Sequence, residues 1–125
     1  MGYMSMALKL KEIVWVGSSR RDLKTFPDPV KLEIGYALFK AQKGDKHHSA
    51  KPFKGKGLKG VFEIVNDYQK DAYRALYAVK IDDKIYVLHS FQKKSKTGIK
   101  TPKQDVDTIV SRYKDAQILS KRKSK

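Results

Sequence analysis

Residues 89–105, HSFQKKSKTGIKTPKQD, gather lysines at the point where an apolar run ends and a helical pattern begins. A lysine ammonium group binds phosphate as a point charge, and crowding among lysines lowers the pKa enough to permit proton transfer. Charge this concentrated suggests an anion held beside the end of a sheet. The candidate catalytic residues of this segment are Lys93 and Lys94, and Lys96 and Lys100 are candidate phosphate-binding residues.

Arg74 is the strongest single catalytic candidate, because it stands alone in the apolar and aromatic segment AYRALYAVKI, residues 72–81. An arginine there is costly unless it meets water or a partner, and its guanidinium can hold two phosphate oxygens at once. The alternative is a structural ion pair with Glu63 on the neighbouring segment. Glu63 would orient Arg74 in either case.

Each of three further sites has a candidate chemical role and an alternative interpretation that is purely structural. His89 titrates near neutrality and suits acid–base work, but it alternates with Val87 and Phe91, which favours a buried histidine. Gln92 can hydrogen-bond a base or a phosphate, or simply end a strand. His47 and His48 suggest a metal, yet no acid or further histidine lies at ligand spacing, so a hydrated loop is expected and no metal or other cofactor.

The net charge of +15 is concentrated in three segments of this 125-residue chain. They are residues 40–59, 93–103 and 121–125, and such a localised field attracts a polyanion, most naturally nucleic acid. A generally basic surface with a disordered tail is the plainer alternative. The sequence contains no cysteine, no signal-peptide pattern and no apolar run of the roughly 20 residues that span a bilayer, so a cytoplasmic protein is expected.

The pattern predicts one α+β domain with the element order β-α-α-β-β-β-α. Three consecutive strands suggest a small, largely antiparallel meander with helices packed on one face. The expected domain spans 9–117, between a flexible extension at 1–8 and a basic, disordered tail at 118–125. The strands are expected at 11–17, 60–66, 72–81 and 84–91, and the helices at 19–26 (capped by Ser18 or Ser19), from 28 to Gly44, and from 102 onward.

The segments KPFKGKGLKGVFEI, AYRALYAV and IYVLHSFQKKSKTGIKTPKQDVDTIVSRYKD resemble the RelE/HigB-like toxins, and in particular the phage-derived proteins of that superfamily. The resemblance implies the RelE-like fold and a small ribonuclease that cuts mRNA on the ribosome. The reaction is attack of the ribose 2′-hydroxyl on the adjacent phosphate, without metal. It also implies inhibition by an antitoxin with a helix-turn-helix domain.

Arg74 matches the arginine of the family's Tyr-Arg-x-Leu-Tyr pattern, and the KPFKG region matches one where lysines approach the RNA. The implied RNA contacts are Lys54, Lys56 and Lys59, with Tyr73 as a residue that stacks on a base, although an aromatic at strand spacing is more often core. Val65 stands where relatives often carry an arginine, which departs from the family pattern.

The sequence thus predicts the toxin of a type II toxin–antitoxin pair, a ribosome-dependent mRNA endonuclease with mRNA, ribosome and antitoxin as partners and no membrane. The first alternative is a non-catalytic, phage-derived protein that binds RNA or the ribosome. The second is a structural or DNA-packaging protein. An enzyme needs Arg74 for activity, whereas a binding protein would lose only a little affinity without it.

Overall fold

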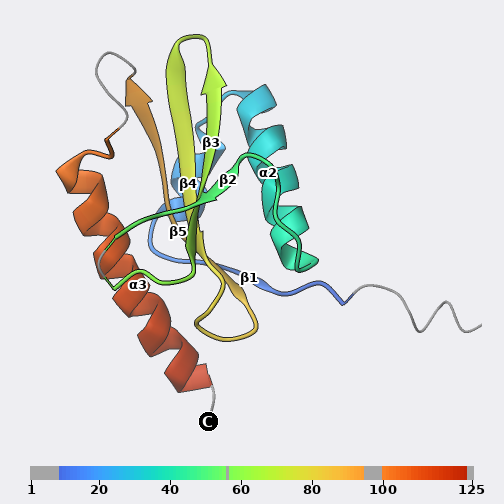
Figure 1. Ribbon diagram of the computed structural model, residues 1–125, viewed down its shortest axis with the longest axis vertical. Helices are drawn as coiled ribbons and strands as arrows, with labels where there is room; N and C mark the ends of the chain where they lie inside the picture. The colour runs from blue at the N-terminus through green and yellow to red at the C-terminus, as the bar shows by residue number, and fades with distance from the viewer. Residues whose placement is uncertain (1–8, 56, 95–99, 124–125) are drawn as a thin grey trace, which may run out of the picture.

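A computed structural model describes residues 9–55, 57–94 and 100–123 (Figure 1). In these residues a five-stranded sheet is accompanied by helices. The elements, in chain order, are β1 (Ile13–Trp15), α1 (Ser19–Lys24), α2 (Asp28–Gln42), β2 (Ala50–Pro52), β3 (Val61–Tyr68), β4 (Asp71–Ala78), β5 (Ile85–Lys94) and α3 (Lys103–Lys123).

The strands follow the order β1-β5-β4-β3-β2 across the sheet. β1 runs parallel to β5, and the other neighbours are antiparallel. This confirms the predicted α+β class, the largely antiparallel sheet and the meander of β3, β4 and β5. The strand β2 was not predicted, because its three residues, AKP, are too few to show an alternating pattern.

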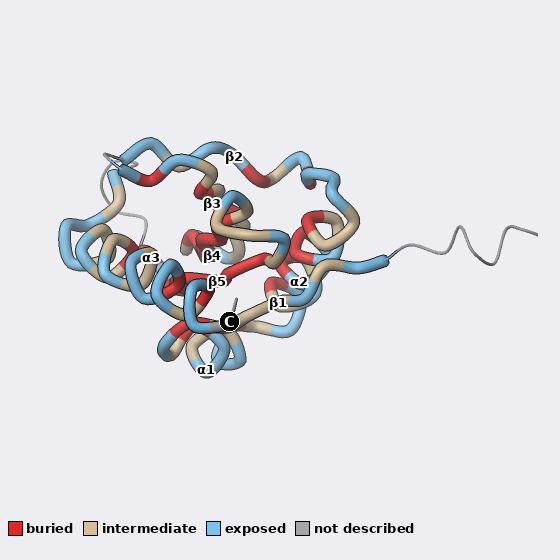
Figure 2. Tube along the Cα trace, turned by 90° about the horizontal axis from the view of Figure 1, so that it is seen from below, coloured by how far each residue is buried: buried red, intermediate tan, exposed pale blue. Residues whose placement is uncertain are grey.

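Helices cover both faces of the sheet, so the prediction that they pack on one face was wrong. Figure 2 shows the sheet nearly edge-on between α2 and α3. The reason lies in β4, whose side chains are apolar on both sides: Ala75 and Tyr77 join the core under α2, whereas Leu76 and Ala78 join the core under α3. Because both faces of the sheet are apolar, each must be covered by a helix.

The core on the α2 side is formed by residues at helical spacing in the predicted helix. Val30, Ile34, Ala37, Leu38 and Ala41 are all at most 4 % exposed and pack against the sheet. Gly44, expected to end this helix, follows it at φ +88°, in the left-handed region that favours glycine. The core on the α3 side is centred on Ile109 and Ala116 from the helix, with Leu88 and Phe91 from β5.

A β-bulge between β4 and β5 changes which side chains share a face. Leu76 pairs with His89, but the next residue, Tyr77, pairs with Val87. The extra residue on β5 places His89 on the α3 side, with Phe91, whereas Val87 packs on the α2 side. The prediction that His89 shares a face with Val87 was therefore wrong.

Two element ends also differ from expectation. β5 continues to Lys94, so Lys93 belongs to the sheet and not to a loop. α3 continues to Lys123, which corrects the prediction of a disordered tail from 118 for the residues that the structure describes. Ser120, 8 % exposed, donates a hydrogen bond to Asp82 Oδ2 at 2.6 Å and ties this end of the helix to the turn before β5. The expected extension at 1–8 lies outside the described residues.

Candidate functional site

Arg74 and Glu63 form a buried ion pair on the α3 side of the sheet. Arg74 pairs in the ladder with Val65, two residues along β3 from Glu63, so the two side chains are diagonal neighbours on one face. Arg74 Nη1 lies 2.5 Å from Glu63 Oε2, and the side chains are only 10 % and 12 % exposed. Among the described residues, Arg74 Nε has no hydrogen-bond partner. This is the pairing that the sequence offered as the alternative to free Arg74.

Lys93 lies beside this pair, and we call Glu63, Arg74 and Lys93 the Arg74 cluster. Lys93 is opposite Ala72 on β4, next to Arg74, and is 9 % exposed. Its Nζ donates to the Lys100 carbonyl at 2.6 Å. Burial lowers the Lys93 pKa, and the positive charge of Arg74 lowers it further, while Glu63 acts in the opposite direction. The cluster therefore contains a phosphate-binding fork, its carboxylate partner and an amine that gives up its proton more readily than usual.

His89 is on the same face, and both of its ring nitrogens are engaged. Nε2 lies 2.7 Å from Asp105 Oδ1 in the first turn of α3, and Nδ1 lies 3.5 Å from Arg112 Nη1. Because arginine can only donate hydrogen bonds, Nδ1 is the acceptor, and the Nε2–H group donates a hydrogen bond to Asp105. The ring also stacks on Phe91, with centroids 4.9 Å apart. This is the satisfied, buried histidine that the strand pattern favoured.

Arg112 connects three elements to this histidine. Its guanidinium donates to the Leu88 carbonyl at 3.1 Å and to Ser18 Oγ at 2.9 Å. Ser18, the N-cap residue of α1, makes no side-chain cap bond and instead donates to Asp22 Oδ2 at 2.8 Å. The sequence reasoning missed Asp105 and Arg112. They share a face of α3 with Ile109, since 105, 109 and 112 follow helical spacing, and charged residues on a buried stripe are the signal for such a network.

Gln92 and Tyr73 are not brought to the Arg74 cluster, because they belong to the opposite face of the sheet. They pair with each other across β4 and β5. Tyr73 is 7 % exposed and packs edge-on against Phe26, with centroids 4.9 Å apart, in the α2-side core. Gln92 is exposed and donates to Asp71 Oδ2 at 2.6 Å. Their geometry fits the core and strand-end alternatives.

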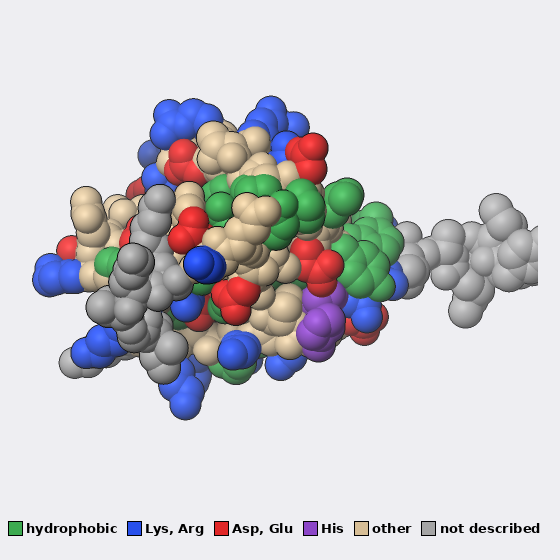
Figure 3. All heavy atoms as spheres, turned by 90° about the horizontal axis from the view of Figure 1, so that it is seen from above, with side chains coloured by type: hydrophobic (Ala, Val, Ile, Leu, Met, Phe, Trp, Pro, Cys, Tyr) green, Lys and Arg blue, Asp and Glu red, His purple; other side chains and the backbone are tan. Residues whose placement is uncertain are grey.

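The lysines predicted to contact RNA fall into separate groups. Lys54, Lys59 and Lys80 line a pocket of about 660 Å³. Val61, the first residue of β3, also lines this pocket, whereas Arg74 pairs with Val65 further along the strand. Lys100 is exposed, and its carbonyl accepts the bond from Lys93. Lys56 and Lys96 lie outside the described residues, as does the side chain of Lys94. Seen from the end where β3 turns into β4, basic side chains are spread around the molecule, with acidic ones among them (Figure 3).

We expect Arg112→Met to lower the free energy of unfolding by about 1.5–3 kcal/mol, the usual value of hydrogen bonds made by a charged group. The methionine keeps the apolar stem and removes every bond to Leu88, Ser18 and His89. Urea unfolding followed by circular dichroism measures the change. Arg122→Met, at an exposed position of the same helix, is the control and should change stability by less than about 0.5 kcal/mol. Equal effects of the two variants would contradict a structural network at Arg112.

Comparison with solved structures finds a chain in the crystal structure of the toxin–antitoxin complex RelBE2 from Mycobacterium tuberculosis. The identity is 19 %, the match covers 68 % of this chain and 100 % of that chain, and the TM-score is 0.48. Among curated proteins, none matches this sequence.

A family model described as "Phage derived protein Gp49-like (DUF891)" matches residues 21–114. The matched range begins in α1 and ends in α3, so it contains the meander and every residue of the Arg74 cluster. It covers well over half of the chain and agrees with the phage-derived group to which the sequence was assigned by resemblance. The chain therefore belongs to the Gp49-like family of phage-derived proteins.

Proposed function

We propose that this protein is the toxin of a type II toxin–antitoxin system and a ribosome-dependent mRNA endonuclease. The observation that carries the proposal is the Arg74 cluster, in which Arg74 Nη1 lies 2.5 Å from Glu63 and a lysine with a lowered pKa stands alongside. The resemblance of residues 85–115 to RelE/HigB-like toxins supplies the reaction class. The ribose 2′-hydroxyl attacks its own 3′-phosphate and leaves a 2′,3′-cyclic phosphate and a 5′-hydroxyl.

Arg74 stabilises the extra negative charge that develops on the phosphate oxygens in the transition state. Glu63 accepts a hydrogen bond from Nη1 of the guanidinium, which leaves other N–H groups of Arg74 to donate to the phosphate. The site is largely removed from water, so this charge pairing is stronger than it would be at an open surface.

Lys93 is the proton acceptor in this proposal. Burial and the neighbouring Arg74 lower its pKa and increase the fraction of neutral amine near neutral pH. The neutral amine takes the proton from the 2′-hydroxyl as that oxygen bonds to phosphorus. The P–O5′ bond then breaks, and the departing oxygen takes a proton from solvent. No metal takes part in these steps.

His89 has a positioning role in the proposal, because each ring nitrogen already has a partner. Through Asp105 it binds the first turn of α3 to β5, the strand that also carries Lys93. Lys54, Lys59 and Lys80 lie at the other end of β3 and contact the RNA backbone outside the reacting phosphodiester. Lys100, whose carbonyl accepts the bond from Lys93, is a proposed contact closer to it. Lys96, outside the described residues, stays a proposed RNA contact.

The proposed partners follow from this activity. The protein acts in the cytoplasm, where mRNA and ribosomes are. An antitoxin with a helix-turn-helix domain would keep it inactive by covering or distorting the surface around the Arg74 cluster. In the described part of the chain, no helix has both the length and the apolar character needed to cross a bilayer.

We expect the wild-type protein to produce discrete new 5′ ends on a defined mRNA during cell-free translation, mapped by primer extension. Arg74→Ala should abolish them, a loss of at least about 10²-fold, because one charge-stabilising group is gone. Removing Arg74 alone also leaves the buried Glu63 carboxylate without a partner and destabilises the fold. A second variant, Arg74→Gln combined with Glu63→Gln, replaces the ion pair by a neutral one and should be folded and inactive.

Arg20→Ala, at an exposed position of α1, is the matched control and should cut like the wild type. Reactions without ribosomes should give no ends. Undiminished cutting by the folded double variant would contradict a role for Arg74.

We expect the cleavage rate of the wild type to rise with pH and to level off above the lowered pKa of Lys93, since only the neutral amine accepts a proton. Lys93→Arg keeps the positive charge but cannot deprotonate in this range. Its rate should be lower by about 10²–10⁴-fold and should lack the rise with pH. Single-turnover rates measured across pH on ribosome-bound mRNA test this. A Lys93→Arg profile parallel to that of the wild type would show that another group accepts the proton.

A non-catalytic RNA- or ribosome-binding protein is the second candidate, and the burial of Arg74 favours it. A residue that is 8 % exposed and paired with Glu63 also fits a purely structural ion pair. In that case the exposed lysines would bind RNA with a strong dependence on salt. Wild-type protein that binds ribosomes but generates no new mRNA ends would support this function over the nuclease.

A further inference from the structure

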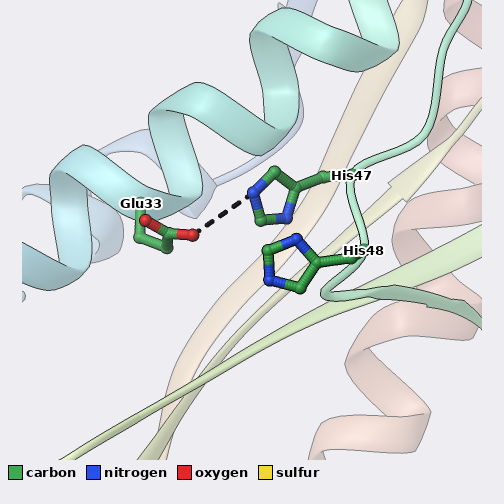
Figure 4. A group of neighbouring side chains, drawn as sticks. All are labelled: Glu33, His47 and His48. Atoms are coloured by element: carbon green, nitrogen blue, oxygen red, sulfur yellow. Dashed lines mark ion pairs between the residues drawn. The ribbon is translucent and has the colours of Figure 1, made fainter.

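Glu33, His47 and His48 form a side-chain cluster on the α2 side of the sheet, away from the Arg74 cluster (Figure 4). Glu33 projects from α2, and the two histidines lie in the segment between α2 and β2. Their possible ligand atoms all lie within 4.8 Å of one another. The sequence favoured a hydrated loop because no acid or further histidine was seen at ligand spacing from the histidine pair. The fold supplies that acid from the helix that precedes the loop.

The distances are close to those of a four-coordinate metal site. His47 Nε2 and Glu33 Oε2 are 3.2 Å apart. Two ligands on a tetrahedral zinc ion are separated by about 3.3 Å, given metal–ligand bonds of about 2.0–2.1 Å. His48 is exposed, so a rotation of its side chain brings its nitrogen to the same distance without disturbing the core. A histidine patch is visible at the molecular surface (Figure 3, purple).

His47 is held in the orientation that a ligand needs. It is only 4 % exposed, and Tyr36 packs edge-on against its ring with centroids 5.4 Å apart. Its Nδ1 accepts a hydrogen bond from the Ser49 backbone N–H at 3.1 Å and lies 2.7 Å from Ser49 Oγ, which fixes the ring with Nε2 towards Glu33. Burial, followed by the charge of His48, lowers the His47 pKa, whereas the charge of Glu33 raises it.

We propose that Glu33, His47 and His48 bind one divalent transition-metal ion, with Zn²⁺ the best fit to two imidazoles and a carboxylate. Water takes the fourth position, on the open side next to His48. The ion is a structural clip that joins α2 to the segment leading into β2. It has no part in the proposed cleavage reaction and does not depend on it.

The surrounding charge sets a limit on the affinity. Lys40 is close enough to act on His47, and the chain as a whole is strongly basic, so a cation is repelled more than at a neutral surface. A hard ion such as Mg²⁺, which prefers oxygen ligands, gains little from imidazoles and should not bind here. Selectivity for zinc over magnesium therefore separates this site from general attraction to a carboxylate.

Isothermal titration of ZnCl₂ into untagged protein, stripped of metal with a chelator and dialysed, tests the proposal. We expect one Zn²⁺ per chain and no binding of Mg²⁺. Glu33→Gln and His48→Ala should each weaken binding by more than about tenfold, since even the loss of an outer partner typically costs 10- to 100-fold. Glu12→Gln, the same change at an exposed position in the chain, is the control and should bind like the wild type.

Glu33→Gln is the decisive variant, because its amide oxygen still accepts a hydrogen bond from His47 and the fold should be retained. Zinc should also raise the thermal midpoint of the wild type but not of this variant, since an ion that binds only the folded state stabilises it. If Glu33→Gln binds zinc with wild-type affinity, the two loop histidines alone hold the ion, and the proposal that zinc joins α2 to this loop is wrong. Absence of zinc binding to the wild type would overturn the site altogether.

Discussion

The burial of β4 on both faces is the constraint on which the Arg74–Glu63 pair and the packing of α3 depend. This strand lies in the middle of the sheet, and its residues from 72 to 78 are all buried. A charged side chain in such a strand must have a partner, and Arg74 finds it in Glu63 on β3. The same requirement places α3 over this face, where Asp105 and Arg112 satisfy His89. The Arg74 cluster thus shares one side of the sheet with a helix that hydrogen bonds attach to β5.

Features that depend on local periodicity could be predicted from the sequence. The sequence predicted a helix from 28 to Gly44, and the residues of α2 at helical spacing, Val30, Ile34, Ala37, Leu38 and Ala41, are all buried. It also predicted the strands at 72–81 and 84–91, which correspond to β4 and β5. The pairing of Arg74 with Glu63 was foreseen because a lone arginine in an apolar strand needs a carboxylate, and the adjacent strand offered one.

Features set by contacts between distant segments could not be predicted in this way. The bulge that moves His89 to the α3 side depends on the pairing of β4 with β5, and neither strand's sequence alone contains a pattern that predicts it. Glu33 approaches His47 only because α2 and the following loop fold back together. The last turns of α3 look like a basic tail in sequence, but the bond from Ser120 to Asp82 attaches them to the domain.

The proposed reaction requires the ribose 2′-hydroxyl to be the nucleophile at the Arg74 cluster. Translation of an mRNA that carries one 2′-deoxynucleotide immediately 5′ of the phosphate where cutting is first mapped tests this requirement. We expect this message to be translated normally but no longer cut at that phosphate, whereas the all-ribose message is cut. Equal cutting of both messages would contradict attack by the 2′-hydroxyl and with it the proposed reaction.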